Sequence, residues 1–339
     1  MTTRTTYLDA HLSGIASEMR RDPSVVFMGQ DLRSQAFGPF PVDDFPKERV
    51  RSLPISENAF VGAAIGAAMT GLRPVIDMTF STFLYSAMDQ VVNQAAKLRY
   101  MSGGQARIPL VLLAGLYYGG SQAAHHADRP MALFANSPGL KIVAPSTPYD
   151  VKGLTLAAIR EDDPVIMFKD ANLHGVREEI PAEDYVIPFG SADLKREGSD
   201  VTVVAIANGV RLALRAASKL ETEGISVEVI DPRSLVPLDF ETIYSSVAKT
   251  GRVVIVDPSP LTCSFASEIT ASVAEHAFSR LRSSPIRVAA ADVPTPFSPQ
   301  LERETLPSVE RVMQAVRRCV GFEGDAPQAA QLRPVSLGT

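Results

Sequence analysis

The sequence predicts two α/β domains, each with a doubly wound, mostly parallel sheet that has helices on both faces. Apolar strand-like runs alternate with helix-like segments along most of the chain, which is the pattern of parallel sheets. The run RIPLVLLAG at 107–115 is apolar almost throughout, as expected of a strand covered on both faces. The alternation lapses in the charged, turn-rich segment 172–200. We therefore predict a first domain at 1–171, a linker at 172–200, a second domain at 201–320 and a loose tail at 321–339.

The elements of the first domain follow from its periodicity and its breaking residues. An amphipathic helix opens the chain, with Leu8, Leu12, Ile15 and Met19 on one face. Strands are predicted at 24–32, 50–55, 74–78, 107–115, 141–145 and 164–169, and helices at 58–70, 86–100, 131–136 and 148–160. Gly71 ends the helix at 58–70, and the Pro- and Phe-rich stretch 33–48 is expected to be a long irregular loop.

The second domain repeats the alternation. Its predicted strands are 201–206, 226–230, 252–256 and 286–290, and its predicted helices are 210–223, 240–250, 265–278 and 308–319. Gly224 and Gly251 each follow a helix, where glycine often forms the C-terminal cap. The proline-rich run DVPTPFSP at 292–299 is expected to be rigid and extended.

The composition is globular and argues against several classes of function. The chain has 339 residues, of which 45% are hydrophobic and 21% charged. A net charge of −5 provides no basic surplus for binding nucleic acid, and no apolar run is long enough to span a membrane. Cys263 and Cys319 are far apart, so a zinc site is unsupported. The sequence lacks an apolar signal core near its start, and we expect a reduced, cytoplasmic protein.

The chain lacks the common nucleotide and hydrolase motifs. No GxGxxG follows a strand, and neither GxxxxGK[ST] nor GxSxG occurs. The remaining candidates for chemistry are Glu57, the aromatic run at 80–85 and the glycine-rich loop that carries His125 and His126. All of them follow predicted strands, on the side where parallel sheets bind ligands. Each of these residues could also have a purely structural role, Glu57 as a helix cap and the loop histidines as surface residues.

The helix after Glu57 carries almost no bulk. It is rich in alanine and glycine through the run NAFVGAAIGAAM. Such a helix lets another group approach its backbone closely. That group could be a neighbouring subunit or a flat cofactor ring.

Several long runs occur together in a recognisable order. They are LPISENAFVGAAIGAAMTGLRP, DQVVNQAAKLRYMSGGQ, NSPGLKIVAPSTPYDVKGLTLAAIREDDPVI and DVPTPFSPQLE. Over about residues 5–320 the chain resembles the beta subunit of the 2-oxo acid dehydrogenase first component, found in pyruvate, branched-chain and acetoin systems. These enzymes depend on thiamine diphosphate. The resemblance implies a pyrimidine-binding domain followed by a transketolase C-terminal-like domain.

The resemblance also implies roles for individual residues. Glu57 would hydrogen-bond the pyrimidine ring nitrogen of thiamine diphosphate and so favour the imino tautomer that takes the thiazolium proton. Phe83 would stack on the pyrimidine, with Phe80 and Tyr85 only packing, and His126 would lie near the thiazolium, whereas His125 is expected at the surface. Further cofactor contacts are expected from Ile55 and Gln30. A potassium site is implied at Ala158, Ile159, Glu161 and Asp163.

Two departures from the family pattern affect the substrate side. The family commonly has His-Ser-Gln where this chain has His126, Ala127 and Asp128, and Gly-Glu-Asp where it has Gly29, Gln30 and Asp31. If the Asp128 carboxylate points inward, it would repel anionic substrates or act as a second acid. The substrate and the acyl acceptor therefore stay open.

The chain lacks the GDG…N motif that holds the cofactor diphosphate through Mg²⁺. In the resembled family that motif lies on an alpha subunit, so this chain would be active only with that partner, in a two-plus-two heterotetramer. The expected reaction is decarboxylation of a 2-oxo acid and acyl transfer to a lipoyl-bearing or acyl-carrier protein. One alternative is a transketolase-like half enzyme that moves a two-carbon unit from a ketose phosphate to a carrier-bound or aldehyde acceptor. Another is a non-catalytic scaffold subunit.

Overall fold

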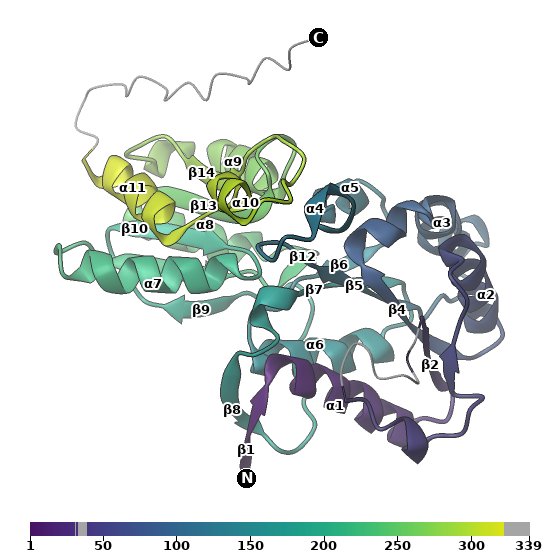
Figure 1. The fold of residues 1–339 in the computed structure, drawn as a ribbon. Helices are drawn as coiled ribbons and strands as arrows, with labels where there is room; N and C mark the ends of the chain where they lie inside the picture. The colour runs from purple at the N-terminus through teal and green to yellow at the C-terminus, as the bar shows by residue number, and fades with distance from the viewer. Residues whose placement is uncertain (31, 33–38, 322–339) are drawn as a thin grey trace.

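The first domain is built on a seven-stranded sheet (Figure 1). The computed structural model describes residues 1–30, 32 and 39–321, so Asp31 and most of the tail predicted at 321–339 lie outside the described residues. In spatial order the strands are β12 (Ser234–Val236), β6 (Lys141–Val143), β7 (Val165–Asp170), β5 (Val111–Leu116), β4 (Arg73–Phe80), β2 (Val25–Gly29) and β3 (Val50–Ser52). All neighbours pair in parallel except β12 with β6.

Helices cover both faces of this sheet. On one face lie α1 (Tyr7–Arg21) and α6 (Pro148–Arg160), which pack on each other and on the sheet. On the other face lie α2 (Glu57–Met69), α3 (Ala96–Met101) and α5 (Met131–Ala135). The single helix predicted at 86–100 is wrong in detail, because the π-helical segment η4 (Gln90–Ala95) precedes α3. Short 3₁₀ turns occur at η2 (Val42–Asp44), η3 (Ser81–Tyr85), η5 (Ala171–Leu173) and η6 (Phe278–Arg280).

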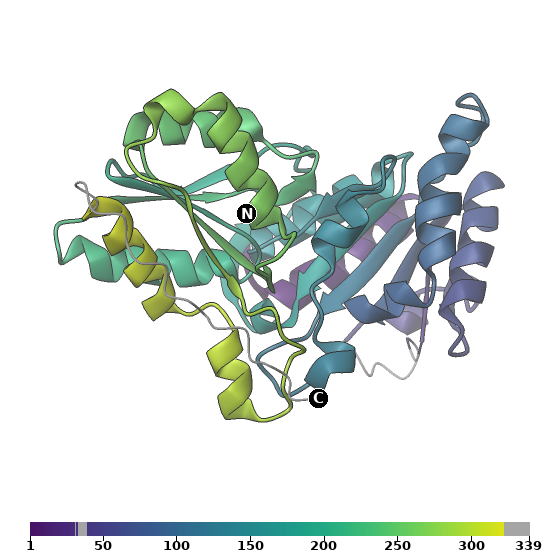
Figure 2. The same cartoon turned by 90° about the horizontal axis from the view of Figure 1, so that it is seen from above.

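The second domain lies beside the first (Figure 2). Its five-stranded sheet has the order β14 (Ile286–Ala290), β13 (Val253–Pro260), β10 (Val201–Ala205), β11 (Val227–Asp231) and β9 (Asp193–Arg196). One face is covered by α7 (Gly209–Glu221) and α11 (Val309–Val320), and the other by α8 (Phe240–Thr250) and α9 (Phe265–His276). The short helix α10 (Pro299–Thr305) follows the proline-rich segment. Both domains therefore have the predicted α/β architecture.

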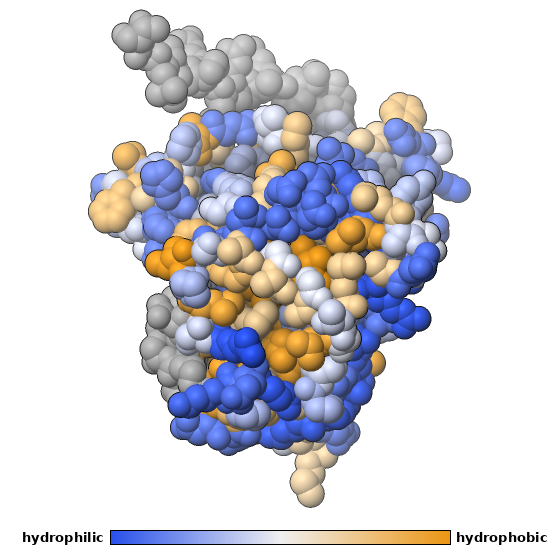
Figure 3. Space-filling model, turned by 90° about the vertical axis from the view of Figure 1, so that its right-hand side faces the viewer, coloured by the Kyte–Doolittle hydropathy of each residue, from blue (hydrophilic) through white to orange (hydrophobic). Residues whose placement is uncertain are grey.

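The small residues of α2 form an uncovered surface. Its bulky side chains, Phe60, Val61 and Ile65, are buried, while Ala63 and Gly66 on the opposite side are exposed. Figure 3 shows apolar and weakly polar residues gathered across the side of the molecule where α2 and α3 lie, between more hydrophilic areas. In this chain nothing lies within 4 Å of a Cβ built at Gly66.

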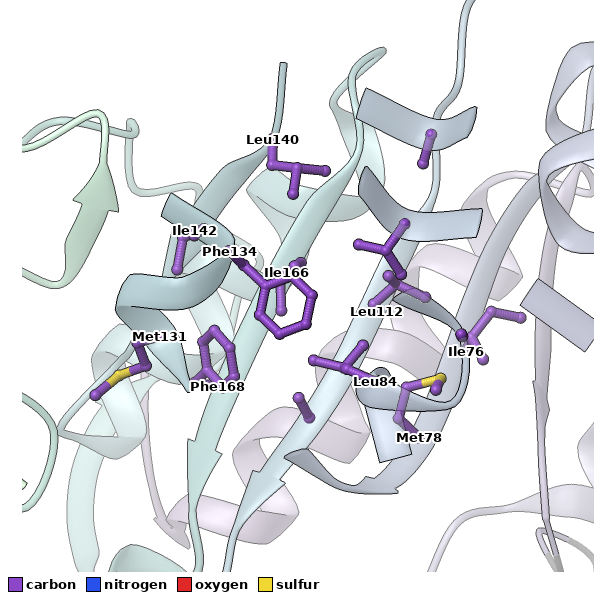
Figure 4. Close-up of a cluster of buried hydrophobic side chains, with 14 of the residues drawn as sticks. Ile76, Met78, Leu84, Leu112, Met131, Phe134, Leu140, Ile142, Ile166 and Phe168 are labelled. Atoms are coloured by element: carbon purple, nitrogen blue, oxygen red, sulfur yellow. The ribbon is translucent and has the colours of Figure 1, made fainter. Parts of the chain in front are cut away.

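The main hydrophobic core lies between the large sheet and the helices on its α2 face (Figure 4). Ile76 from β4, Leu112 from β5 and Phe168 from β7 point from the sheet toward Leu84 and Phe134. All five side chains are fully buried, and burial of each contributes about 1.5–3 kcal/mol. This core fixes the strand ends on which the candidate site lies.

Three features have no local signal in the sequence. The predicted linker 172–200 contains β8 (Arg177–Pro181) and β9, which is the antiparallel edge of the second sheet. Strand β8 pairs with β1 (Thr2–Thr6), where the sequence predicted only a helix. Strand β12 belongs to the second half of the chain but extends the first sheet. These pairings depend on segments that are distant along the chain.

No helix in the described part of the chain has both the length and the apolar character that crossing a membrane requires.

Candidate functional site

The candidate site lies at the carboxyl ends of the parallel strands of the first sheet. Gln30 follows β2, Glu57 opens the helix after β3, Phe80 ends β4 and Tyr117 follows β5. Because the strands are parallel, all four ends lie along one edge of the sheet. The chain thus brings polar and aromatic side chains that follow or end four strands to one edge of the sheet.

Glu57 and Gln30 form one part of this site. Ser56 holds the N-cap position of α2, and Glu57 is the first residue of the helix. The Glu57 side chain is largely buried, and its Oε1 accepts a hydrogen bond of 2.9 Å from Nε2 of Gln30. A carboxylate has several acceptor positions, so Glu57 can accept a further hydrogen bond. Two residues earlier, the side chain of Ile55 is 82% exposed.

A cluster of aromatic rings forms the second part. The ring centroid of Phe80 lies 5.3 Å from that of Phe83, 4.8 Å from Tyr117 and 4.4 Å from His126. The centroids of Phe83 and His126 are 5.8 Å apart. Phe80 is therefore the centre of the cluster, whereas the sequence suggested packing only. Sequence reasoning missed Tyr117, although an aromatic residue directly after a buried strand was a usable signal.

The structure separates the two adjacent histidines. Both lie on the short helix α4 (Ala123–His126), which belongs to the glycine-rich loop after β5. The His126 ring is partly buried against Phe80 and Phe83, while His125 is exposed. The rings of Phe80 and Phe83 orient His126 alone, so only His126 is held within the site.

Asp128 follows α4 and is partly buried. Its Oδ2 accepts a hydrogen bond of 3.1 Å from the Tyr85 hydroxyl, and its carbonyl oxygen accepts one of 2.7 Å from the Ser81 hydroxyl. Burial and the Asp128 charge raise the pKa of Tyr85 well above its usual value. Tyr85 therefore stays a neutral donor to Asp128 and does more than pack.

A buried group of charged and polar residues lies at the ends of β4 and β7. Nζ of Lys169 is 3.7 Å from Oδ2 of Asp77, and both residues are largely buried. The His174 ring packs against Tyr117, with centroids 6.0 Å apart. Burial and the Lys169 charge lower the pKa of His174 to about 4, so its ring is neutral near pH 7. The sequence analysis did not single out this group, although polar residues at the ends of apolar strands indicate it.

The residues of the implied potassium site lie together at the end of α6. The carbonyl oxygens of Ile159 and Glu161 both accept hydrogen bonds from Nη1 of Arg73, at 3.0 and 2.9 Å. The Asp163 carboxylate pairs with Arg99, and the Ala158 carbonyl accepts from the Glu161 amide at 3.3 Å. Nζ of Lys141 also pairs with the Glu161 carboxylate at 2.6 Å, so cationic side chains already contact both the carbonyl and the carboxylate oxygens. Potassium at this position stays a prediction. The described residues contain no group of three or more His, Cys, Asp and Glu that could hold a metal.

Comparison with known proteins shows the family to which the chain belongs. Residues 3–174 match the family described as transketolase, pyrimidine binding domain, and residues 190–312 match transketolase, C-terminal domain. The chain is 41% identical to the acetoin:2,6-dichlorophenolindophenol oxidoreductase subunit beta of Bacillus subtilis, over 92% of this chain and 96% of the relative. The 2-oxoisovalerate dehydrogenase subunit beta of the same organism is 40% identical, over 93% and 98% of the two chains. The chain belongs to the family of 2-oxo acid dehydrogenase first-component beta subunits.

Further matches include a pyruvate-type beta subunit and a solved transketolase structure. The pyruvate dehydrogenase E1 component subunit beta of Bacillus subtilis is 37% identical, over 94% of this chain and 99% of the relative. Among solved structures, a split-gene transketolase described as an inactive beta4 tetramer aligns with a TM-score of 0.78 and 25% identity, covering 93% and 98% of the two chains. The transketolase-type domains support thiamine diphosphate as the cofactor of this enzyme subunit.

Proposed function

We propose that this beta subunit acts with an alpha subunit to decarboxylate a 2-oxo acid and to pass the acyl group to a lipoyl group on an acceptor protein. The observation that carries the proposal is the edge of the first sheet, where the Glu57–Gln30 pair and the Phe80–His126 cluster lie. A carboxylate, an aromatic wall and a histidine fit one half of a thiamine diphosphate site. The similarity to acetoin, branched-chain and pyruvate-type beta subunits supports the same reaction class.

Each part of the site has a role in this proposal. Glu57 accepts a hydrogen bond from a protonated ring nitrogen, and Gln30 holds its carboxylate in place. Phe83 and the exposed Ile55 provide apolar surface for the pyrimidine ring. When bound, thiamine diphosphate would supply a nucleophilic carbon for addition to the oxo carbon and an electron sink for the pair released with CO₂. His126 holds or moves a proton at the reacting oxygen, oriented by Phe80.

The site requires a second chain in this proposal. The sequence has no GDG…N motif, so we assign the diphosphate and its Mg²⁺ to an alpha subunit. The uncovered small-residue side of α2 provides a surface for a second copy of this chain in a two-plus-two assembly. Potassium at the end of α6 would then support the loop that begins at Glu161.

The test is reconstitution with the cognate alpha chain. We expect CO₂ release from pyruvate or a branched-chain 2-oxo acid, and transfer of the acyl group to a lipoylated acceptor. The variant Glu57→Gln keeps the size of the side chain but loses its charge, so turnover should fall by about 100-fold or more. The exposed Glu197→Gln serves as the control and should retain activity.

Two outcomes would contradict the proposal. Unchanged activity in Glu57→Gln would favour a scaffold subunit whose partner holds the complete site. Consumption of a ketose phosphate, with no CO₂ from any 2-oxo acid, would favour a transketolase-like half enzyme, as in the split-gene structural relative.

A further inference from the structure

The loop that carries His126 belongs to the first domain, but a carboxylate of the second domain holds it. Glu302 lies on α10 and is 1% exposed. Its Oε1 accepts a hydrogen bond of 2.7 Å from the Gly119 amide, and its Oε2 accepts one of 2.8 Å from the Ser121 amide. Both oxygens of one carboxylate therefore bind the backbone of one loop. Hydrogen bonds to an ionised acceptor are stronger than neutral ones, and a buried carboxylate depends on them.

The backbone of this loop does not adopt its conformation by local preference. Ser121 has a φ of 59° and Ala123 a φ of 60°, in the left-handed region that side chains with a Cβ disfavour. Ala123 begins α4, and His126 ends it. Contacts outside the loop must therefore hold the turn that sets the direction of α4, and Glu302 binds at Ser121, two residues before α4 begins.

The far end of the loop is held by the second domain as well. The carbonyl oxygen of Arg129 accepts a hydrogen bond of 3.0 Å from the Ser259 hydroxyl, at the end of β13. The Arg129 guanidinium is 3.4 Å from the Thr295 hydroxyl and lies over the Tyr118 ring at 5.2 Å from its centroid. Figure 2 shows α10 beside the short helix of the loop. The second domain thus contacts the loop on both sides of His126.

We propose that Glu302 is a positioning residue for His126 and that the second domain, through Glu302, holds the loop in its working geometry. The inference rests on the proposed role of His126, because that role makes the position of the loop matter. Without the two amide contacts, the turn at 119–123 relaxes and the imidazole loses its fixed place against Phe80. Glu57, at the start of α2, and Gln30, after β2, lie outside this loop and are not affected.

The test uses the complex of this chain with its alpha subunit. The variants are Glu302→Gln, which replaces one acceptor with a donor, and Glu302→Asp, which keeps the charge but shortens the reach. Glu304→Gln, on the exposed side of the same helix, is the matched control. The measurements are hydrogen exchange of the amides at 117–126, kcat and KM for the 2-oxo acid, and the affinity for thiamine diphosphate.

We expect Glu302→Gln to speed exchange of the loop amides by about tenfold or more, because a hydrogen bond to a charged group is lost. It should lower kcat by about tenfold to a hundredfold, with cofactor affinity within about twofold of the wild type. Glu302→Asp should be intermediate and Glu304→Gln unchanged.

Unchanged exchange in the loop would overturn the proposal, whatever the activity. A fall in thermal stability and cofactor affinity at constant kcat would also overturn it, since that pattern indicates a purely structural contact. If Glu302→Gln does not fold, the same comparison is made with Glu302→Asp. If the wild-type complex releases no CO₂, the proposed function fails, while loop exchange still decides the role of Glu302.

Discussion

At the scale of single residues, His125 and His126 provide an internal comparison because they are neighbours in different surroundings. The His126 ring packs on Phe80 and Phe83, whereas His125 is exposed. We expect His126→Ala to lower turnover about 100-fold, as is typical for loss of a positioned acid–base group, and His125→Ala to change it less than about twofold. Single-turnover CO₂ release and acyl transfer in the reconstituted complex measure both. Equal effects of the two substitutions would contradict the assignment.

The sequence could predict those site residues that lie within recognisable local motifs. Glu57, Phe83 and His126 each follow a predicted strand, within motifs that resemble a known family. The structure places Phe83 and His126 in one cluster. Tyr117 and Glu302 could not be found in that way. Their roles depend on which loops meet at the sheet edge and on how the second domain packs, and neither is a local property of the sequence.

At the scale of elements, a close contact fixes the turn between α5 and β6. Gly139 has a φ of 105°, and a Cβ added there would lie 1.9 Å from the carbonyl oxygen of Ala96 in α3. We expect Gly139→Ala to destabilise the chain by about 3 kcal/mol or more, from backbone strain together with overpacking. Gly104→Ala is the control, because its φ is also positive, at 85°, but nothing lies within 4 Å of the added Cβ. Gly104→Ala should lower the free energy of unfolding by about 1 kcal/mol.

Urea unfolding of the two glycine variants measures this difference. Losses of equal size would show that the contact with Ala96 relaxes without cost.

The uncovered side of α2 provides a second element-level prediction. Because Gly66 has open space, Gly66→Leu should leave the chain alone as stable as the wild type or more stable by about 0.5–1 kcal/mol, through better helix propensity. In the proposed assembly the same leucine would block close packing of α2 against a second copy of the chain. Sedimentation of the mixture with the alpha chain should then show less of the complete complex.

Ser218→Leu, on the exposed side of α7, is the matched control for this experiment. It should assemble as the wild type does. Normal assembly of Gly66→Leu would mean that this side of α2 is not an interface.

Most of the fold could be predicted where one element contains its own signal. The strand at 286–290 and the helices at 148–160 and 240–250 have the predicted bounds, because their periodicity and capping residues are local. The pairing of β1 with β8 and the addition of β12 to the first sheet could not be predicted, since each depends on a strand more than 80 residues away along the chain.

At the scale of the whole molecule, a buried cluster of charges joins the two domains. Asp150 lies in the first turn of α6 in the first domain, and its carboxylate contacts Lys195 of β9 at 2.8 Å and Arg233 at 3.2 Å. Asp231, at the end of β11, accepts hydrogen bonds from the Ser146 hydroxyl and from the Arg233 amide, the latter at 2.9 Å. Nζ of Lys195 is 3.8 Å from Asp231. Charged side chains of both domains thus meet in one buried cluster.

This cluster predicts a dependence of stability on pH. Burial and the negative charge of Asp150 raise the pKa of Asp231 to about 7, against the opposing effect of Lys195. An unfolded aspartate has a pKa near 3.9, so the folded chain holds this proton more tightly. The stabilisation is complete below about pH 4 and is lost as the pH rises through about 7. Asp231→Asn removes this titration, so between pH 5 and pH 8 it should lose about 2 kcal/mol less stability than the wild type does.

Urea unfolding at the two pH values measures this difference, and groups that titrate in both proteins cancel in the comparison. Asp193→Asn is the control, because Asp193 contacts the same Lys195 at 2.6 Å but is 39% exposed, and it should keep the wild-type slope. If the unfolding free energy of Asp231→Asn changes between pH 5 and pH 8 as much as that of the wild type, Asp231 stays ionised over this range. Its contacts with Lys195 and Ser146 then offset its burial. In either outcome the result decides whether Asp231 carries a proton at the contact between the two domains.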